Sequence, residues 1–211
     1  MNYHDQHTGF ISRLNAWLLH QGSDRYNQLT DERKRSLISG LTGRVLEIGP
    51  GTGANLEYYP EELLLTGLEP NPHMQQYLRE KAGRLGRQID IITGAAEEIP
   101  LEDESMDGVV STLVLCSVTD VQQALHEIKR VLKPGGTFLF IEHVAAPKHT
   151  FLRRIQRWIK PLWRRMADGC KPERETWKAI KKAGFDEVEV EHFRLSLPVV
   201  GTHIMGRAMK A

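Results

Sequence analysis

A glycine-rich segment that follows an apolar run is the strongest chemical signal in the sequence. Residues 45–54 have the sequence VLEIGPGTGA, which places glycines at Gly49, Gly51 and Gly53. Glycines permit a tight turn and let a ligand approach the backbone, and a helix that begins directly after Gly53 would offer free N–H groups. A dinucleotide fingerprint has the spacing G-x-G-x-x-G, so its last glycine comes one residue later. The spacing here favours a ligand without a pyrophosphate and disfavours a nicotinamide oxidoreductase.

An acidic residue stands where a nucleoside site needs one. Glu69 comes 20 residues after Gly49 and directly after the apolar run Leu63–Leu68. A carboxylate at the end of that strand can accept hydrogen bonds from both hydroxyls of a ribose. The glycine segment alone is also compatible with a simple turn. Together with the strand before it and the acid after the next strand, it predicts a nucleoside-binding site.

Four further side chains are candidates for chemistry because ligands of parallel α/β sheets bind beyond the carboxyl ends of the strands. They are His143, Cys116, Asp168 and His203. We predict Asp168 and His143 as a catalytic base or an orienting pair, with His203 as the third candidate. The alternatives are a capped or solvated histidine, a turn at Asp168, and Cys116 as an apolar pocket wall rather than a nucleophile. The nine histidines show no ligand spacing, which predicts no catalytic metal.

Composition limits the class of protein. The chain has 211 residues, 40% of them hydrophobic, which suits one domain with its own core. Lys plus Arg number 28 and Asp plus Glu 27, and this balance argues against a nucleic-acid partner. Cys116 and Cys170 are 54 positions apart, form no CxxC pair and suit a reducing compartment. We find neither about 18 consecutive apolar residues nor a signal-peptide pattern, so we expect a cytoplasmic protein.

The apolar pattern predicts the elements that position these residues. Helical spacing occurs over Phe10–Leu18, and a second helix is expected to begin at Thr30 as its N-cap. Further helices are expected from Pro72, over Asp120–Leu132 and over Glu173–Lys182. Short apolar runs predict strands at Val45–Ile48, Leu63–Leu68, Ile89–Thr93, Gly108–Leu115, Thr137–Val144, Phe185–Phe193 and Val199–Met209.

The order of these elements predicts the fold. Strands that alternate with helices form a parallel sheet covered on both faces. Only a few residues around Pro198 join the last two strands, and so short a link forces an antiparallel pair. We therefore predict an α/β fold: a doubly wound, mostly parallel, seven-stranded sheet that ends in an antiparallel hairpin. The single domain divides into N-terminal helices at 1–42, a cofactor-binding core at 43–147, a basic helical insertion or lid at 148–183, and a C-terminal β-hairpin at 184–211.

Basic side chains are concentrated in residues 148–182. The segment holds twelve bases and three acids, and apolar residues from Phe151 to Trp163 interleave with them at roughly helical spacing. Three interpretations stay open. The segment is a solvated helix face, a lid over a hydrophobic acceptor, or, through residues 151–165, a peripheral contact with an anionic membrane.

Four motifs occur in one order along the chain: EIGPGTG at 47–53, LEPN at 68–71, GAAEEIP at 94–100 and LKPGG at 132–136. They resemble the successive motifs of class I S-adenosylmethionine-dependent methyltransferases. The resemblance implies S-adenosylmethionine as cofactor, with Glu47 at its amino group and Glu69 at its ribose. Many relatives have Asp where Ala95 stands, so here Glu97 or backbone carbonyls would bind the adenine amino group. The implied cofactor contacts are Glu47, Gly49, Gly51, Gly53, Glu69, Pro70, Ala96, Glu97, Thr112 and Leu113.

Motifs outside that core carry a closer resemblance. The segments STLVLCSV at 111–118, EHVAAP at 142–147, DGC at 168–170, RETWK at 174–178 and GTHIMG at 201–206 are similar to those of the methyltransferase-like 7 proteins, the microsomal alkyl-thiol S-methyltransferases of animals. The resemblance implies a thiol acceptor. The animal members begin with a hydrophobic membrane-anchoring helix, whereas this chain has only the short amphipathic stretch Phe10–Leu19.

These features predict an enzyme that transfers a methyl group from S-adenosylmethionine to a small, hydrophobic acceptor. A thiol is the leading acceptor because of the matching segments outside the core. With a pKa of about 8.5, a thiol needs only a mild base such as histidine to form the thiolate. A lipid-headgroup amine or a quinone-like ring is the alternative acceptor, motivated by the basic aromatic segment. A cofactor-binding protein without turnover is the third hypothesis. The oligomeric state does not follow from the sequence.

Overall fold

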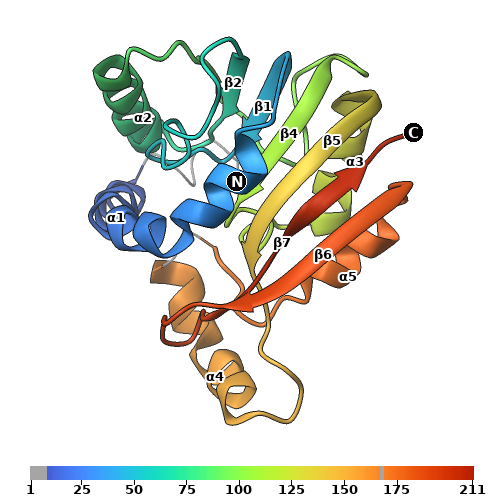
Figure 1. Cartoon of the computed structure of the whole chain (residues 1–211). Helices are drawn as coiled ribbons and strands as arrows, with labels where there is room; N and C mark the ends of the chain where they lie inside the picture. Colours follow the sequence, from blue (N-terminus) through green and yellow to red (C-terminus); the bar gives the residue numbers. More distant parts are fainter. Residues whose placement is uncertain (1–8, 167–168) are drawn as a thin grey trace.

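The structure is a computed structural model and describes residues 9–166 and 169–211. Helices and strands alternate along most of the chain (Figure 1). The helices are α1 (Phe10–Ile38), α2 (Pro72–Leu85), α3 (Val121–Val131), α4 (Phe151–Met166) and α5 (Thr176–Lys182). The strands are β1 (Arg44–Ile48), β2 (Leu64–Leu68), β3 (Asp90–Ile92), β4 (Met106–Thr112), β5 (Leu132–His143), β6 (Glu187–Arg194) and β7 (Thr202–Met209).

The strands that the structure describes form one seven-stranded sheet in the order β3-β2-β1-β4-β5-β7-β6. Pairs from β3 to β5 are parallel, whereas β7 runs antiparallel to both of its neighbours. This topology confirms the predicted mostly parallel sheet that ends in an antiparallel hairpin. The register places Ile48 of β1 beside Ser111 of β4, and His143 of β5 beside His203 of β7. The carboxyl ends of the parallel strands therefore share one edge of the sheet.

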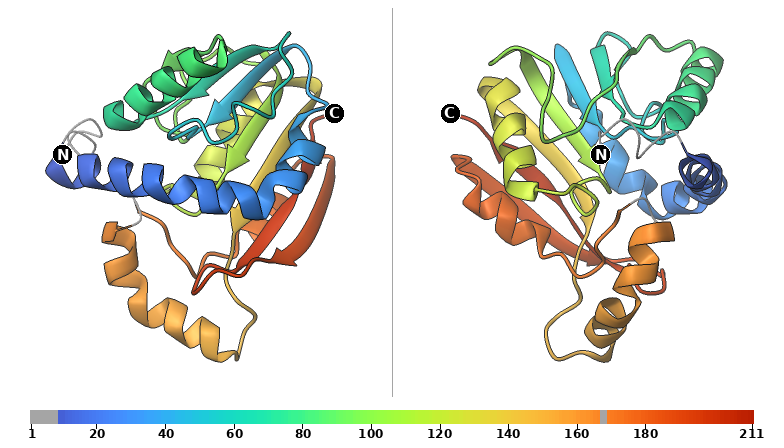
Figure 2. Two further views of the ribbon diagram at one scale, coloured as in Figure 1. Left: turned by 60° about the vertical axis from the view of Figure 1, so that its left-hand side comes forward. Right: turned by 180° about the vertical axis from the view of Figure 1, so that it is seen from behind.

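Side chains that alternate along the strands divide the core into two layers. In β1, Leu46 and Ile48 belong to one apolar cluster and Val45 to the other. The first cluster includes α3 and α5, and the second includes α2 and the end of α1. Figure 2 shows these helices on opposite faces of the sheet. This is the doubly wound arrangement that the sequence predicts.

Local signals explain where two of the helices begin. Asn71 is the N-cap of α2, and its side chain accepts a hydrogen bond from the backbone N–H of His73 at 3.0 Å. Proline at the first helical position already has the backbone angle of a helix. Asp120 caps α3 in the same way by accepting from the N–H groups of Gln122 and Gln123. Both starting points agree with the sequence-based prediction.

The predicted break between two N-terminal helices is wrong. Residues Phe10–Ile38 form one continuous helix, and Thr30 lies within it. The hydroxyl of Thr30 donates to the carbonyl of Tyr26, four residues earlier, at 2.8 Å. A threonine bonded in this way continues a helix rather than capping the start of one.

The predicted helix directly after the glycine segment is also wrong. Residues 51–58 form consecutive turns. Their backbone bonds span three residues: Gly53 N–H donates to Pro50, Leu56 N–H to Gly53, and Tyr58 N–H to Asn55. Glycines at positive φ keep the chain tightly turned here, so an α-helical ladder does not form.

Helix α1 lies across the shared carboxyl edge of the sheet. The left view of Figure 2 shows it extending from below α2 to the outer strands β6 and β7. Its side chains and backbone contact Ala54 after the glycine loop, Asn71 before α2, Phe193 of β6 and His203 of β7. The edge where ligands bind in such sheets is therefore covered by a helix.

Helix α4 projects away from the sheet (Figure 1). Two of its large apolar side chains are solvent-exposed, Phe151 to 76% and Trp158 to 90%. A bilayer-spanning helix is absent from the part of the chain that the structure describes.

Candidate functional site

The glycine loop joins the end of β1 to the turns that follow. Gly49, Gly51 and Gly53 have φ angles of 58°, 56° and 82°, a region that favours glycine. A Cβ on Gly49 would lie 2.6 Å from Val114 Cγ2, so no side chain fits there. The loop therefore presents bare backbone at the carboxyl edge of the sheet.

The carboxylate of Glu69 lies beside this loop. Its Oε2 accepts from the N–H of Gly51 at 2.9 Å, and its Oε1 accepts from the N–H of Asn71 at 2.9 Å. The side chain is only 4% exposed, and the neighbouring Pro70 is half-buried. Two backbone donors thus hold a charged acceptor at the end of β2, where the sequence predicts the ribose contact.

Glu47 brings a second carboxylate into the same region from the interior of β1. It is 1% exposed, and its Oε1 accepts from the Asn55 side chain at 2.7 Å. The Asn55 amide also donates to the hydroxyl of Thr112 at 3.0 Å, which links the loop to β4. Burial raises the pKa of Glu47 to about 7, although the Asn55 hydrogen bond opposes this shift.

Unused acceptor atoms test whether these residues fit the expected cofactor. Glu47 Oε2 and Asn55 Oδ1 are buried and have no hydrogen-bond partner within residues 9–166 and 169–211. Such acceptors suit an ammonium group, and the Glu69 carboxylate suits paired hydroxyls. The donor–acceptor pattern therefore fits a ribonucleoside that carries an amino-acid group, as S-adenosylmethionine does. The sequence-based prediction missed Asn55, whose signal is a polar residue two positions after the last loop glycine.

The positions predicted for adenine lie in the loop between β3 and β4. Ala96 is 7% exposed. Glu97 Oε1 accepts from the backbone N–H groups of Thr119 and Asp120, at 2.7 and 3.3 Å. The carboxylate of Glu97 thus fastens its own loop to the start of α3.

Leu113 has an unusual backbone at the end of β4. Its φ is 60°, a left-handed conformation that is uncommon for a residue with a side chain. Its N–H donates to the carbonyl of Ile141 at 2.9 Å, which continues the pairing of β4 with β5. The chain then turns sharply above the two strands, beside Thr112. Strain of this kind is concentrated at ligand-binding edges.

Lys34 of α1 is a buried cation above the glycine loop. Its side chain is fully buried, and Nζ donates to Asn27 Oδ1 at 2.7 Å and to the Ala54 carbonyl at 3.4 Å. Burial lowers the pKa of Lys34 to about 8, and the negative charge of Glu47 opposes that shift. The sequence-based prediction missed this residue because a lysine in an amphipathic helix is typical of a solvated face.

A thiol–imidazole cluster lies at the ends of β4 and β5, and we define it as Cys116, His143 and Cys170. Cys116 Sγ, His143 Nε2 and Cys170 Sγ lie within 4.8 Å of one another, and all three residues are buried. The shortest contact is 2.7 Å, between His143 Nε2 and Cys170 Sγ. Hydrogen bonding with Cys170, together with burial, raises the pKa of the Cys116 thiol well above its ordinary range. Burial by itself lowers the pKa of His143, but Cys116 and Glu142 outweigh it, so the net direction is upward.

Two of the three predicted catalytic residues lie in or beside this cluster. His143 and His203 face each other across β5 and β7, with ring centroids 6.4 Å apart. His203 Nδ1 contacts the Gly201 carbonyl at 3.2 Å, and burial lowers the pKa of His203 to about 4. The ring is therefore neutral near pH 7 and accepts protons weakly there. Asp168 lies outside the described residues.

Glu142 is a buried acid that the sequence-based prediction did not select. It is fully buried, and its Oε1 accepts from Ser111 Oγ at 2.6 Å and from the N–H groups of Val114 and Leu115 at 3.0 Å. These bonds hold the turn that carries Cys116 above β5. The available signal was an acid inside an otherwise apolar strand, because such a residue needs dedicated partners.

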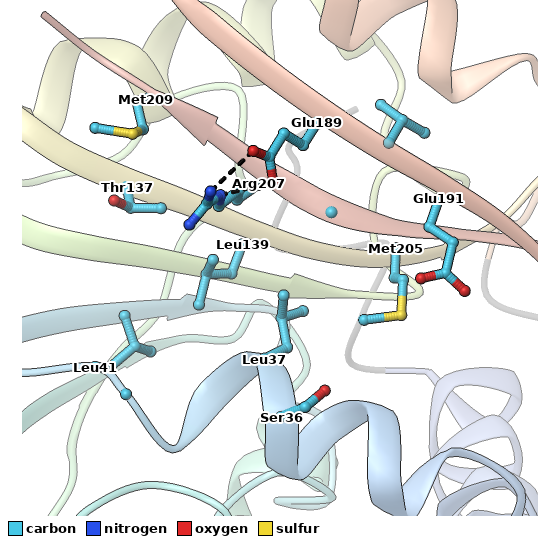
Figure 3. A pocket seen from close by; sticks show the side chains of 13 residues that line it. Ser36, Leu37, Leu41, Thr137, Leu139, Glu189, Glu191, Met205, Arg207 and Met209 are labelled. Atoms are coloured by element: carbon cyan, nitrogen blue, oxygen red, sulfur yellow. Dashed lines mark hydrogen bonds and ion pairs between the residues drawn. The ribbon is translucent and has the colours of Figure 1, made fainter.

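A separate pocket of about 590 Å³ lies on one face of the outer strands (Figure 3). It is lined by Leu37 and Leu41 beside the end of α1, by Met205 and Met209 of β7, and by the Glu189–Arg207 ion pair. None of the predicted site residues lines this pocket. Its position does not coincide with the carboxyl edge, so we place the functional site at the edge.

Comparisons with known proteins identify the family of the chain. Residues 46–140 match the family model described as a methyltransferase domain. The human protein named thiol S-methyltransferase TMT1B is 40% identical over 199 residues, covering 87% of this chain and 81% of that protein. Human thiol S-methyltransferase TMT1A is 38% identical, covering 88% and 81%. The chain therefore belongs to the methyltransferase family that includes these two human proteins.

A solved structure shows the same fold for this methyltransferase at lower identity. A SAM-dependent methyltransferase from Thermotoga maritima has a TM-score of 0.65 and 24% identity, and the match covers 90% of this chain and 95% of that one. S-Adenosylmethionine is thus the cofactor that the methyltransferase domain implies.

Proposed function

We propose that this methyltransferase transfers a methyl group from S-adenosylmethionine to the sulfur of a small thiol. The observation that carries the proposal is the extent of the similarity. The methyltransferase domain matches residues 46–140, but the human thiol S-methyltransferase TMT1B matches 87% of the chain. The similarity therefore includes segments outside the cofactor-binding core, and such segments choose the acceptor.

The cofactor contacts follow from the geometry of the edge. Glu47 and Asn55 would hold the ammonium group through their unused oxygens, and Glu69 would accept from the ribose hydroxyls. The backbone of Gly49, Gly51 and Gly53, together with Thr112 and Leu113, would line the methionine end, while Pro70, Ala96 and Glu97 would border the nucleoside. The bound cofactor supplies a methyl group on a positively charged sulfur.

The acceptor side needs little besides positioning and exclusion of water. A thiol with a pKa of about 8.5 is partly ionised near neutral pH, so strong activation is not needed. His143 lies at the end of β5, and α1 covers the edge from the solvent side. Val114 contacts the position of Gly49, so the segment leading to Cys116 adjoins the glycine loop. We propose that His143 and Asp168 position the thiol, with Asp168 remaining a prediction from sequence.

Membrane contact through α4 is a further part of the proposal. Phe151 and Trp158 are separated by seven residues, which is two helical turns, and are 76% and 90% exposed. Arg154 and Arg157 are exposed on the same helix. Exposed aromatic rings flanked by basic groups suit the interface of an anionic membrane. This arrangement supports a hydrophobic acceptor that is delivered from a lipid surface.

An acceptor panel tests the proposed function. The purified full-length chain is incubated with S-adenosylmethionine and alkyl thiols, aryl thiols, vesicles of phosphatidylethanolamine, or a reduced quinone lacking one methyl group. We expect S-adenosylhomocysteine release and a methylated product, identified by mass spectrometry, only with thiols. Glu47→Gln should weaken the signal when S-adenosylmethionine is below saturation, whereas Glu57→Gln, whose exposed carboxylate pairs with Lys81, should retain it.

Two outcomes would contradict the thiol assignment. Methylation of the lipid amine or the quinone ring, with no thioether, would establish the alternative acceptor class. Tight binding of S-adenosylhomocysteine without product from any acceptor would identify a cofactor-binding protein without turnover.

A further inference from the structure

The thiol–imidazole cluster brings together donor atoms that a soft divalent cation prefers. Its three donor atoms lie within 4.8 Å of one another, and each side chain is at least 94% buried. The chain has two cysteines, and both belong to the cluster. Two thiolates and one imidazole form a ligand set typical of zinc sites that keep a fourth position open.

The separation of the donor atoms is compatible with one Zn²⁺ ion. Zn–S bonds of about 2.3 Å and Zn–N bonds of about 2.0 Å, in tetrahedral geometry, put donor atoms roughly 3.5–3.8 Å apart. The 4.8 Å limit on the cluster includes this spacing. His143 Nε2 and Cys170 Sγ, now 2.7 Å apart, would separate by roughly 0.8 Å around an ion. Small rotations of the two side chains supply that distance.

Contacts from distant segments hold the cluster together. The N–H of Lys171 donates to the Cys116 carbonyl at 3.0 Å, so the segment that carries Cys170 is fastened beside Cys116. The guanidinium of Arg174 donates to two further carbonyls of the turn around Cys116. The indole N–H of Trp163 donates to Cys170 Sγ at 3.2 Å, which ties α4 to the cluster. These contacts therefore hold the segments that carry the ligands beside one another, so only side-chain rotations are left for ion binding.

We propose that Cys116, His143 and Cys170 bind one Zn²⁺ ion, and that the fourth coordination position takes the sulfur of the acceptor thiol. The second part of this proposal rests on the proposed function. The turn that leads to Cys116 adjoins the glycine loop, because a Cβ on Gly49 would lie 2.6 Å from Val114, two residues before Cys116. His143 then acts as a ligand rather than as a free base.

Coordination would activate the acceptor. An acceptor R–SH releases its proton to solvent as its sulfur binds Zn²⁺, because a coordinating thiol is deprotonated. A sulfur electron pair forms the new S–CH₃ bond, while the methyl–sulfur bond of the sulfonium cofactor breaks and its electron pair stays on the cofactor's sulfur. Both products are neutral thioethers. The methylated acceptor has no negative charge to hold it on the ion, so it leaves.

The test uses the full-length chain, reduced and freed of metal, with Co²⁺ as the probe. We expect one Co²⁺ per chain, with a near-ultraviolet thiolate-to-cobalt absorption band that only the two cysteines can produce. Cys116→Ser, Cys170→Ser and His143→Asn should each weaken Co²⁺ binding by at least about 100-fold. The surface control His126→Asn should bind as the unsubstituted chain does, because His126 is exposed and outside the cluster.

A second measurement does not depend on how the variants fold. Zn²⁺ should slow alkylation of both thiols in the unsubstituted chain by at least about tenfold, because an ion that binds the folded cluster makes it open less often and keeps the two buried sulfurs away from the reagent. Equal alkylation rates with and without Zn²⁺ would overturn the metal site. Co²⁺ binding that survives all three substitutions would overturn it as well.

Ethanethiol separates the metal site from the proposed function. Added to the Co²⁺-loaded chain, it should shift the visible cobalt bands, whereas ethyl methyl sulfide should not. An unchanged spectrum with ethanethiol would overturn the fourth-position ligand. Thiol methylation at equal rates by the metal-free and Zn²⁺-loaded chains would overturn the role of Zn²⁺ and leave the proposed function intact. A spectral shift without any methylated product would support the site and contradict the proposed function.

Discussion

The carboxyl edge of the sheet has two halves that are built in different ways. The cofactor half comprises the glycine loop, Glu47 and Glu69 at the ends of β1 and β2. It uses carboxylates and backbone N–H groups from residues close together in sequence. The half proposed to bind the acceptor, which we call the acceptor half, is the thiol–imidazole cluster at the ends of β4 and β5, whose donors come from three separate segments. The first half offers hard oxygen acceptors, and the second offers soft sulfur and nitrogen.

This difference indicates how one fold can separate cofactor binding from acceptor binding. Hydrogen-bond acceptors suit the hydroxyl and ammonium groups of a cofactor shared by many methyltransferases. Sulfur and imidazole suit a particular acceptor or an ion that activates it. Helix α1 covers both halves and contacts Ala54 on one side and His203 on the other. Variants of single residues should therefore affect one half and spare the other.

The largest expected effect is on turnover, from His143→Asn in the acceptor half. Loss of the imidazole removes the group that we propose positions the thiol, and we expect kcat to fall about 1,000-fold. The dissociation constant of S-adenosylhomocysteine should change less than about twofold, because the cofactor half is intact. Steady-state kinetics with an alkyl thiol and calorimetric titration measure the two quantities. Equal loss of cofactor binding would show that the halves are not separate.

Glu69→Ala should have the next largest effect, now on the cofactor half. The substitution removes the charged acceptor that holds Gly51 and Asn71 and would bind the ribose. Hydrogen bonds to a charged group contribute about 1.5–3 kcal/mol, so we expect affinity for S-adenosylhomocysteine to fall about 100-fold. Calorimetric titration checks this value, with the exposed Glu62→Ala as the control. An unchanged affinity would exclude Glu69 as the ribose contact.

Arg174→Ala should loosen the acceptor half without removing any of its donors. The guanidinium donates to the carbonyls of Leu115 and Val118, and it is part-buried. We expect a loss of about 2 kcal/mol in the free energy of unfolding, or about 4–8 °C in Tm. Differential scanning calorimetry measures the change, and the exposed Arg157→Ala should leave Tm within about 1 °C. A smaller Tm change in Arg174→Ala than in Arg157→Ala would contradict this role.

The smallest expected effect is a pH dependence confined to the cofactor half. With a pKa of about 7, Glu47 is mostly protonated at pH 6 and mostly ionised at pH 8. Its attraction for an ammonium group therefore grows with pH, and the affinity for S-adenosylhomocysteine should rise about tenfold over this range. Lys34, with a pKa of about 8, loses its charge toward the upper end and reinforces the trend. Glu47→Gln should bind more weakly throughout and lose the slope; a retained slope would assign it to another group.

The strands, most helices and the position of Glu69 beside the glycine loop could be predicted because their signals are local. Asn71 and Asp120 cap the helices that follow them, and alternating apolar runs form the strands. Two predicted helix starts, at Thr30 and directly after Gly53, are wrong because the surrounding structure overrides the local sequence signal. Thr30 has the type of an N-cap, but its hydroxyl bonds to Tyr26 within a single continuous helix. The segment after Gly53 has helical composition, but the positive φ angles of the loop hold it in turns.

The sequence by itself determined the class of sheet, the glycine loop and the acid beside it, because each depends on residues within one strand–turn–helix unit. Only the tertiary structure decided the acceptor half. Cys116, His143 and Cys170 stand 27 residues apart in each interval, a spacing that matches no known ligand motif. They meet because β4 and β5 are parallel neighbours with their carboxyl ends together, and because the segment after α4 folds back onto the turn after β4. The number of residues between two positions predicts their distance in space only within one helix or strand. Between strands, the register of the sheet determines that distance.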